Sequence, residues 1–403
     1  MKIVYLHQYF KTPDMAGGTR SYEMARRLVS WGHEVHIVTS RAELRAEALD
    51  WHTELIDGIN VHWFNNSYNN TMGFYARIRS FFRFAYAAAK KSALLRGDLV
   101  FATSTPLTIA LPGVYAAKKS KCPMVFEVRD LWPEVPIALE VIKNPLLIYA
   151  SRALELFAYK NSAHIVALSE DMANGIVKRG IERNKVSVIP NSADLDLFDP
   201  NHIRPGLFKM LKPELLRRPM VLYPGTLGRV NGVSYLVQLA EAVRPLNSDI
   251  SFVVIGEGAE LDKVKKLAVQ NGTLGCNFFH FPPMPKVELV NAFRDSVAII
   301  SLVIDVEALE ANSANKFFDG LAAGKPIIIN HGGWQKELIE VESLGVVLPR
   351  DVTEAALVLS RFLKNKDLVH QSGENARRIA KDRFSREDLA KRLEKIFIQV
   401  CSG

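Results

Sequence analysis

Residues 1–40 read MKIVYLHQYFKTPDMAGGTRSYEMARRLVSWGHEVHIVTS, and this stretch decides the fold. The apolar run KIVYLHQY predicts a strand, TRSYEMARRLVSW has the spacing of an amphipathic helix, and HEVHIVTS predicts a second strand. Gly32 marks the end of the helix. A strand, a helix and a strand in succession predict a parallel β–α–β unit, because parallel neighbours need a crossover connection.

The same alternation continues along the chain and predicts an α/β protein with two Rossmann-like domains. The first strand series continues with NVHWF, DLVFATS, PMVFEVRD, HIVALS and VSVIP, and the second comprises MVLYPGT, SFVVIGEG, CNFFHFP, SVAIISLV, KPIIIN and GVVL. The last helices are expected near 354–364 and 387–399. The series break at a segment rich in Pro, Asp and Arg, so we assign 1–191 to the first domain, 192–218 to a linker and 219–382 to the second domain. Ligands are expected beyond the carboxyl ends of the strands, in a cleft between the domains.

Composition limits the function classes. The chain has 403 residues, of which 48% are hydrophobic and 23% charged, as in ordinary globular proteins. Its three cysteines have no paired spacing, which fits a reducing compartment and excludes a disulfide framework. The start lacks the features of a signal peptide, and no apolar run is long enough to span a membrane. A net charge of +8 favours anionic partners.

Each predicted domain begins with a strand, a glycine-rich turn and a helix. In the first, AGGTRSYEMARRL at 16–28 supplies Gly17, Gly18, Thr19 and Arg20. In the second, LYPGTLGRVNG at 222–232 supplies three candidates: Gly225, Thr226 and Arg229. Glycine lets a ligand approach the backbone, and Arg pairs with phosphate in a fork geometry. The alternative is a plain strand-to-helix turn with a solvated Arg.

The stretch EANSANKFFDGLAAGKPIIIN at 310–330 resembles a phosphate loop but has the wrong spacing and order. Gly324 and Lys325 close a helix, and Pro326 cannot continue it. Asn312 and Ser313 are candidate N-caps of that helix. Lys316 and Asp319 are three residues apart and share its face. A helix N-terminus beside a Lys predicts an anion site.

Two further motifs contain carboxylates. FEVRDLWPE at 126–134 places Arg129 and Asp130 after a strand, where they form either a site or a structural ion pair. ADLDLF at 193–198 has the Asp-x-Asp spacing of some metal sites, but its apolar neighbours favour packing. No His/Cys cluster predicts another metal site.

The segment 73–97 is basic and aromatic without an acid, as in a helix on anionic lipid. The candidate membrane residues are Arg77, Arg79, Phe81, Phe82 and Arg83. The alternatives are an ordinary surface helix and a surface for single-stranded nucleic acid.

Together these motifs resemble the retaining GT-B glycosyltransferases of family GT4. The resemblance covers essentially the whole chain through GGTRSYEMARRLVSWGHEV, RDLWPE, IPNSADLDLF, YPGTLGR, VIGEG and NKFFDGLAAGKPII. Within the family, the chain is most similar to the N-acetyl-L-fucosaminyl (L-FucNAc) transferases of bacterial O-antigen or capsule assembly. The resemblance implies a metal-independent enzyme without cofactors, a UDP-sugar donor, and a C-terminal helix at 383–403 that packs back on the first domain.

The resemblance also implies roles for individual residues. The expected donor site comprises Gly225, Thr226, Pro283, Met284, Asn312, Ser313, Asn315, Lys316 and Asp319. By the same resemblance Arg229 would neutralise the donor diphosphate, and the turn around Gly225 and Thr226 would line the reaction centre. Pro283 and Met284 would offer backbone groups to the base, and Asp319 would accept from the ribose hydroxyls. The acceptor side comprises Gly17, Gly18, Thr19 and Arg20. The catalytic candidates are Arg129, Asp130, Arg229 and Glu310.

The chain departs from the family pattern in three places. Asp319 stands for the second Glu of the family's Glu-x7-Glu pair, and Glu310 lies one position from the first. Arg129 replaces a His that is often seen after the fourth strand. The Lys that usually follows the diphosphate Arg is absent, and we expect Lys316 to compensate.

The expected function is transfer of a sugar to a polyprenyl-diphosphate-linked saccharide in bacterial O-antigen or other lipopolysaccharide biosynthesis. Such an enzyme would be cytoplasmic and lie peripherally on the inner face of the cytoplasmic membrane. It would bind an anionic membrane surface and no nucleic acid. Two alternatives stay open: a nucleotide-sugar 2-epimerase of the same fold, and a basic non-catalytic nucleic-acid-binding protein.

Overall fold

The computed structural model describes residues 1–402, apart from residues 16, 42–49, 67–71, 105, 200–207, 209 and 210. The chain divides into two compact units, and we treat each by itself. Unit 1 contains residues 1–12, 19–190 and 387–403. Unit 2 contains residues 13–18 and 191–386.

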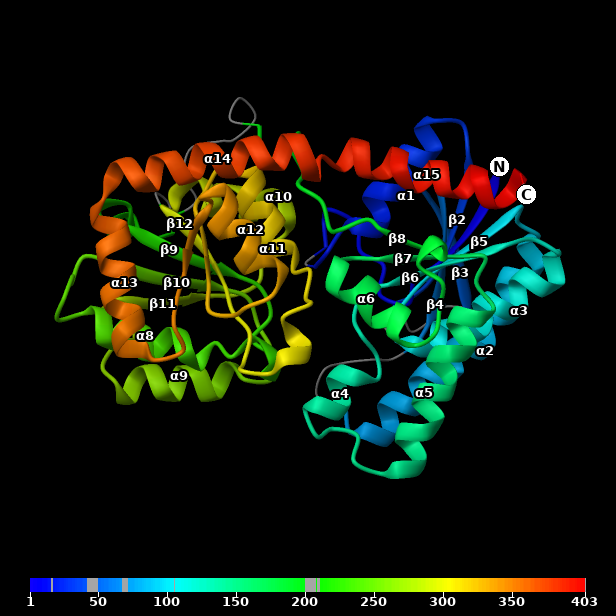
Figure 1. The fold of residues 1–403 in the computed structure, drawn as a ribbon, viewed down its shortest axis with the longest axis horizontal. Coiled ribbons are helices and arrows are strands. Elements are labelled where there is room, and N and C mark those ends of the chain that lie inside the picture. Colours follow the sequence, from blue (N-terminus) through cyan, green and yellow to red (C-terminus); the bar gives the residue numbers. More distant parts are fainter. Residues whose placement is uncertain are drawn as a thin grey trace. The chain divides into compact units, whose positions relative to one another are not determined.

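Unit 1 is built on an eight-stranded sheet with the order β3-β4-β2-β1-β5-β6-β7-β8 (Figure 1). The strands are β1 (Lys2–Leu6), β2 (Glu34–Arg41), β3 (Trp51–Ile56), β4 (Ile59–Asn65), β5 (Leu99–Thr103), β6 (Met124–Val128), β7 (His164–Ala167) and β8 (Val186–Val188). Neighbouring strands are parallel except β3, which pairs antiparallel with β4. Strands β5 and β6 are buried along their whole length, because helices cover both faces of a parallel sheet.

The helices of unit 1 lie on the two faces of this sheet (Figure 1). They are α1 (Arg20–Ser30), α2 (Phe74–Leu95), α3 (Ala110–Ser120), α4 (Glu134–Ala138), α5 (Pro145–Lys160), α6 (Glu170–Lys178) and α15 (Arg386–Ser402). Helix α3 contacts both α2 and α5, so these three form one layer. Helix α15 joins the core of unit 1 through Phe397, whose ring centroid lies 5.0 Å from that of Phe101.

Unit 2 contains a six-stranded parallel sheet with the order β11-β10-β9-β12-β13-β14. The strands are β9 (Met220–Pro224), β10 (Ser251–Ile255), β11 (Phe278–Phe281), β12 (Ala298–Ser301), β13 (Ile327–Ile329) and β14 (Gly345–Val347). The helices are α8 (Ser234–Val243), α9 (Leu261–Gln270), α10 (Lys286–Asp295), α11 (Asn315–Ala322), α12 (Trp334–Glu342), α13 (Val352–Lys364) and α14 (Lys366–Phe384).

Successive side chains of a strand point to opposite faces of the sheet, so the strands of unit 2 contribute to two separate cores. Val253 and Ile255 of β10 pack with α10, α11 and α14 on one face. Phe252 and Val254 pack with α8, α9 and α13 on the other. In both units all strands except β3 run parallel, so their carboxyl ends gather at one edge of each sheet.

The segment 192–218, which we predicted as a linker, is counted with unit 2. Phe198, Phe208 and Leu215 from this segment are buried in the core that α10, α11 and α14 cover. These residues of the predicted linker therefore pack within unit 2. This could not be predicted from its Pro, Asp and Arg content, because its few apolar residues do the packing.

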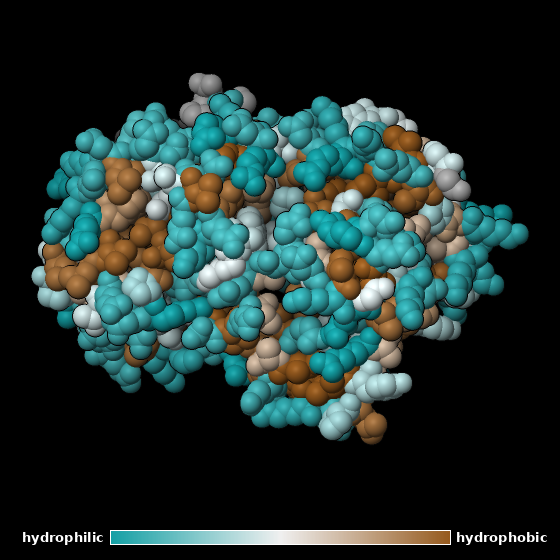
Figure 2. Space-filling model, viewed as in Figure 1, coloured by the Kyte–Doolittle hydropathy of each residue, from teal (hydrophilic) through white to brown (hydrophobic). Residues whose placement is uncertain are grey.

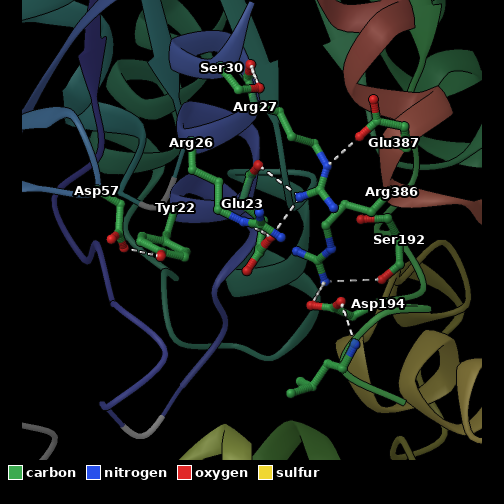
Figure 3. A network of polar contacts seen from close by, with 11 residues as sticks. Tyr22, Glu23, Arg26, Arg27, Ser30, Asp57, Ser192, Asp194, Arg386 and Glu387 are labelled. Carbon is green, nitrogen blue, oxygen red and sulfur yellow. Dashed lines mark hydrogen bonds and ion pairs between the residues drawn. The ribbon is translucent and has the colours of Figure 1, made fainter. Parts of the chain in front are cut away.

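The chain passes from unit 1 to unit 2 at 190/191 and back to unit 1 at 386/387. Polar contacts hold the residues near both crossing points (Figure 3). On the unit 2 side, Arg386 donates to the Ser192 carbonyl at 3.4 Å and pairs with Asp194 at 3.7 Å. On the unit 1 side, Arg27 of α1 pairs with Glu387 at 3.0 Å. Asp194 of the Asp-x-Asp motif thus makes a structural ion pair.

Two elements differ from the expectation from sequence. WHTELIDGINVHWF forms a β3–β4 hairpin, of which we predicted only the second strand. Asp57 and Gly58 have positive φ values of 46° and 79°, as a tight Asp-Gly turn requires. Helix α14 was also missed, because its sequence is mostly polar and its apolar positions are widely spaced. Among the described helices, none is long and apolar enough to cross a membrane.

Candidate functional site

The first group of candidate residues lies where β9 and β10 of unit 2 end. The Gly225 amide donates to the Ile255 carbonyl at 2.9 Å, and the Leu227 amide donates to that of Glu257 at 2.8 Å. These bonds lock the loops after the two strands together, backbone against backbone. Gly225 has a φ of +155°, and a Cβ at this position would lie 3.0 Å from Cε of Lys316. Glycine is required here because it leaves the space that the Lys316 side chain enters.

Lys316 is the most unusual cation of unit 2. It lies in the first turn of α11, is only 8% exposed, and donates to the Tyr223 hydroxyl at 3.0 Å. Its ammonium also lies 4.2 Å from the centroid of the Tyr223 ring. Burial lowers the pKa of Lys316 to about 7. In the described part of the chain no carboxylate forms an ion pair with it, so the site favours a bound anion.

The start of α11 differs from our expectation. We predicted Asn312 or Ser313 as the N-cap, but the helix begins at Asn315 and its N-cap residue is Ala314, which offers no side-chain bond. The Ser313 hydroxyl instead accepts from the Asn191 amide at 3.4 Å. Asn312 accepts from Gln335 of α12 at 2.9 Å through its carbonyl. Gln335 also donates to Oδ1 of Asn312 at 3.2 Å, so tertiary contacts use both side chains. The first N–H groups of α11 have no side-chain cap.

Asp319, one turn further along α11, forms an ion pair with Lys286. Both side chains are largely buried, with 7% and 11% of their surfaces exposed. Lys286 begins α10 and is separated by Pro285 alone from Pro283 and Met284, which we assigned to the nucleotide base. The ion pair therefore joins the loop 282–286 to the carboxylate that we assigned to the ribose. We did not select Lys286 from the sequence, because nothing local distinguishes it from a surface lysine.

Glu310 follows a short 3-10 turn and points toward the loop after β13. Its carboxylate accepts from the Gly332 amide at 3.2 Å. Cβ atoms on Gly332 or Gly333 would collide with Glu310 at 2.8 and 2.6 Å, so both glycines are fitted to it. His331, the residue before Gly332, is 4% exposed and has no partner for Nε2 among the described residues. Burial lowers its pKa to about 4, and it was missed as a candidate.

Arg229, Thr226 and Asn315 complete the predicted donor group. Arg229 begins a 3-10 turn after Gly228, is exposed, and has no ion-pair partner among the residues that the structure describes. Thr226 is exposed, and its carbonyl accepts from the Tyr223 hydroxyl at 2.8 Å. The Asn315 amide lies 2.6 Å from where a Cβ of Gly18 would stand. Gly17 and Gly18 are counted with unit 2, whereas Thr19 and Arg20 belong to unit 1.

Arg20, which we assigned to the acceptor side, lies buried in unit 1. It is 2% exposed and pairs with Glu127 of β6 at 2.8 Å. Nη1 donates to the Pro190 carbonyl at 2.6 Å, Nη2 also donates to the Ile189 carbonyl at 2.9 Å, and Nε donates to Glu127 at 3.0 Å. Every arm of the guanidinium thus has a protein partner. The alternative of a solvated Arg is therefore wrong for Arg20. The sequence did not indicate the ion pair, because Glu127 is 107 residues away.

Arg129 and Asp130 follow β6 at the carboxyl edge of the unit 1 sheet. The Arg129 amide donates to the Ser104 hydroxyl at 2.9 Å, and its guanidinium lies 3.2 Å from Nε2 of His7. Burial and the nearby Arg129 charge lower the pKa of His7 well below its usual range. Asp130 is exposed at this edge.

The predicted membrane residues lie on α2 and divide by exposure. Arg79, Phe82 and Arg83 are exposed. Phe81 is half-buried, and Arg77 is half-buried with Nε donating to the Met72 carbonyl at 2.9 Å. Among the described residues, no group of three or more His, Cys, Asp and Glu side chains could hold a metal ion.

Two family models match consecutive parts of the chain: Glycosyltransferase Family 4 over residues 17–197, and Glycosyl transferases group 1 over residues 211–379. The probable glycosyltransferase WbjE of Pseudomonas aeruginosa is 25% identical over 270 residues, covering 65% of this chain and 65% of that protein. The lipopolysaccharide 1,2-N-acetylglucosaminetransferase of Salmonella typhimurium is 23% identical over 266 residues, covering 62% of this chain and 67% of that protein.

The solved structure of Anabaena Alr3699/HepE in complex with UDP and glucose is similar along the entire chain. It gives a TM-score of 0.71 at 15% identity and covers 99% of this chain and 100% of that one. At this identity the likeness supports the fold alone. Together the two family models cover most of the chain, in the order of its two units. The protein therefore belongs to the GT4 glycosyltransferases, whose two Rossmann-like domains define the GT-B fold.

Proposed function

We propose that this protein transfers a sugar from a UDP-sugar donor to a lipid-linked saccharide acceptor in bacterial polysaccharide or lipopolysaccharide biosynthesis. N-acetyl-L-fucosamine is the donor sugar that the sequence resemblance favours. The lipopolysaccharide transferase among the relatives supports the pathway class, and the UDP complex of the Anabaena protein supports the donor class. The proposed place of action is the cytoplasmic face of the cytoplasmic membrane.

The observation that carries this proposal is the buried Lys316 at the uncapped start of α11. An ammonium without a carboxylate partner beside free helix N–H groups is suited to a diphosphate. Lys316 also reaches the Gly225 turn, which the resemblance assigns to the reaction centre. Arg229 is a second cation, exposed and in the same loop as Gly225, and would pair with the other phosphate.

The proposed reaction needs no metal or cofactor. The bond between the anomeric carbon and the diphosphate oxygen breaks, and the acceptor oxygen bonds to that carbon. UDP leaves, and the acceptor proton is released. Lys316, Arg229 and the α11 amides would stabilise the negative charge that develops on the leaving diphosphate. Asp130 is the candidate to accept the proton, and Glu310 and Arg129 are the candidates to contact the sugar.

The nucleoside end of the donor would meet Pro283 and Met284 by their backbone groups and Asp319 by its carboxylate. Lys286 would hold Asp319 in position for the ribose hydroxyls. This arrangement assigns donor recognition to unit 2. Retention of the anomeric configuration is expected for the family and is part of the proposal.

A thermal-shift screen tests the donor class, because a ligand that binds the native state raises its apparent stability. We expect UDP to stabilise the protein and GDP or NAD to have no effect. The matched pair is Lys316→Met and Lys325→Met. Lys325 also lies near α11, but its ammonium donates to the Arg294 and Ser296 carbonyls at 2.9 and 2.6 Å.

The two variants should behave in opposite ways. Lys316→Met should abolish the UDP-induced shift while the unliganded protein stays folded. Lys325→Met should lower the melting temperature but keep the shift. A normal UDP shift in Lys316→Met would contradict the site. Conversion of a UDP-sugar without an acceptor would favour the epimerase alternative.

A further inference from the structure

The layer formed by α2, α3 and α5 of unit 1 carries almost only positive charge (Figure 1). Helix α2 has five Lys or Arg residues, α3 has two and α5 has two, whereas Glu155 of α5 is the single acid in the three helices. Glu155 is buried and pairs with Arg179 of α6 at 3.1 Å. It therefore does not reduce the positive charge at the surface of this layer.

Aromatic and basic side chains alternate along the exposed side of α2. This stripe follows the spacing of one helix face and contains Tyr75, Arg79, Phe82, Arg83, Tyr86, Lys90 and Leu94. Tyr75 and Leu94 are 86% and 78% exposed, which is unusual for such large apolar side chains. The Lys90 ammonium lies 4.4 Å from the centroid of the Tyr86 ring. Tyr115 and Lys118 of α3 are also exposed, so the next helix presents the same combination of an aromatic and a basic side chain.

The start of α5 adds an aliphatic projection to this layer. Leu146 and Tyr149 are 77% and 75% exposed, and Leu147 and the preceding Val141 are exposed as well. Residues 143–147 are all exposed, so the first turn of α5 is uncovered on all sides and not only along one face. Figure 2 shows hydrophobic side chains around α4 and at the tip where α5 begins. Water is a poor environment for such a projection.

This projection is a fixed part of the fold. Asn144 caps α5 by accepting from the Leu146 amide at 2.9 Å, and Pro145 occupies the first position of the helix. Arg179 of α6 pairs with both Glu134 of α4 and Glu155 of α5. These ion pairs hold α4 and α5 against the rest of unit 1. The exposed tip of α5 is therefore already helical before it meets a partner.

We propose that the α2–α3–α5 layer is a docking surface for an anionic lipid bilayer. The tip of α5 enters the boundary of the acyl chains, and the cations of α2 and α3 bind the headgroup phosphates. This extends the surface beyond the α2 residues selected from sequence, and it rests on the proposed lipid-linked acceptor. A nucleic acid would satisfy the cations but offers nothing to Leu146 and Leu147, so a membrane is the better match.

Vesicle sedimentation tests the proposal with the full chain. The protein is mixed with vesicles of phosphatidylglycerol and phosphatidylcholine in equal parts, or of phosphatidylcholine alone, at low and high salt. We expect binding to the anionic vesicles that weakens with salt. Each cation removed should lower the affinity about fivefold. Lys118→Ser/Lys119→Ser should therefore weaken binding, and Lys364→Ser/Lys366→Ser, two exposed lysines of unit 2, should not.

The aliphatic tip needs its own variant and control. Leu146→Ser/Leu147→Ser should lose most of the binding that persists at high salt. Val341→Ser/Leu357→Ser removes two exposed apolar residues of unit 2, 79% and 51% exposed, and should bind like the parent. As a measure of depth, Tyr149→Trp should add fluorescence that lipids with brominated chains quench.

The outcomes separate this proposal from the proposed function. Equal loss in the tip variant and its control, or no binding to anionic vesicles by the parent, would overturn the docking surface. Tighter binding to a labelled oligonucleotide than to vesicles at the same salt would also overturn it. If the UDP-induced thermal shift persists in these cases, the donor site stands. Vesicle binding without any UDP shift would leave the surface intact and reject the donor site.

Discussion

At the scale of single residues, the charge state of Lys316 decides how the candidate site responds to pH. Burial lowers its pKa to about 7, so in the free protein the ammonium is lost as the pH rises above this value. A bound diphosphate favours the charged form and raises the pKa. Binding therefore takes up a proton above about pH 7, and the affinity falls as the pH rises, by up to about tenfold per pH unit.

Calorimetric titration with UDP-glucose tests this prediction, because its diphosphate does not titrate near neutrality. The affinity should decline from about pH 7 to about pH 9. Because binding takes up protons from the buffer, the measured heat of binding should vary with the ionisation enthalpy of the buffer. Lys316→Met should bind weakly with no such decline. The same depressed pKa makes the unliganded protein more stable as the pH rises through this range, because the lysine of the unfolded chain keeps its proton up to its ordinary pKa of 10.5.

The Arg20–Glu127 pair should matter for stability and not for donor binding. Burial acts to raise the pKa of Glu127, but the Arg20 and Arg129 guanidinium groups outweigh it and hold the pKa below its usual value. Glu127→Gln or Arg20→Met should lower the free energy of unfolding by about 3 to 5 kcal/mol, because the partner is left buried and unpaired. Urea unfolding measures this. A loss of UDP binding without a loss of stability would contradict it.

Sequence alone could locate Lys316, Asp319 and Gly225, because each sits in a local pattern: a helix start or a strand-to-helix turn. It could not locate Lys286, Glu127 or His331, whose importance comes from partners far along the chain or from burial. The same limit explains Arg20, which looked like a cation in a first helical turn and proved to be the partner of a buried carboxylate.

At the scale of elements, the turn after β9 depends on a glycine in the neighbouring turn. A Cβ on Gly256 would lie 2.0 Å from the Gly225 carbonyl oxygen, at a φ of +154°. Gly256→Ala should therefore displace the Gly225 turn, lower the free energy of unfolding by more than about 3 kcal/mol and weaken UDP binding. The control is Gly32→Ala, at φ +87° with nothing within 4 Å. It should cost about 1 to 2 kcal/mol of strain and leave UDP binding unchanged.

Most helices and strands could be predicted from the spacing of apolar residues and from the glycine and proline residues that end them. The exceptions have physical causes. The buried parallel strands are continuous apolar runs, and Gly324, with φ +63°, ends α11 as its sequence indicated. Lys325 is structural, as the rejected phosphate loop implied. The β3 strand was missed because only half of its residues are apolar and none of them is fully buried at this sheet edge. The cap of α11 was misplaced because Asn312 and Ser313 bond to other segments.

At the scale of the whole molecule, the last two helices stabilise different units although only Ser385 separates them. Phe384, at the end of α14, packs 5.2 Å from Phe318 in unit 2, and Phe397 of α15 packs 5.0 Å from Phe101 in unit 1. The stability of each unit should therefore respond to a different part of the C-terminal segment.

Phe397→Ala and Phe384→Ala form a matched pair for this prediction. Each removes one buried ring and should cost about 3 to 5 kcal/mol in the unit that contains it. Amide hydrogen exchange followed by mass spectrometry resolves the two responses. Phe397→Ala should speed exchange in β1 and β5, and Phe384→Ala should speed it in β12 and β13. Equal acceleration in both sheets for either variant would mean that the units unfold as one, because the loss in one packed core would then be transmitted to the other through the chain passages at 190/191 and 386/387.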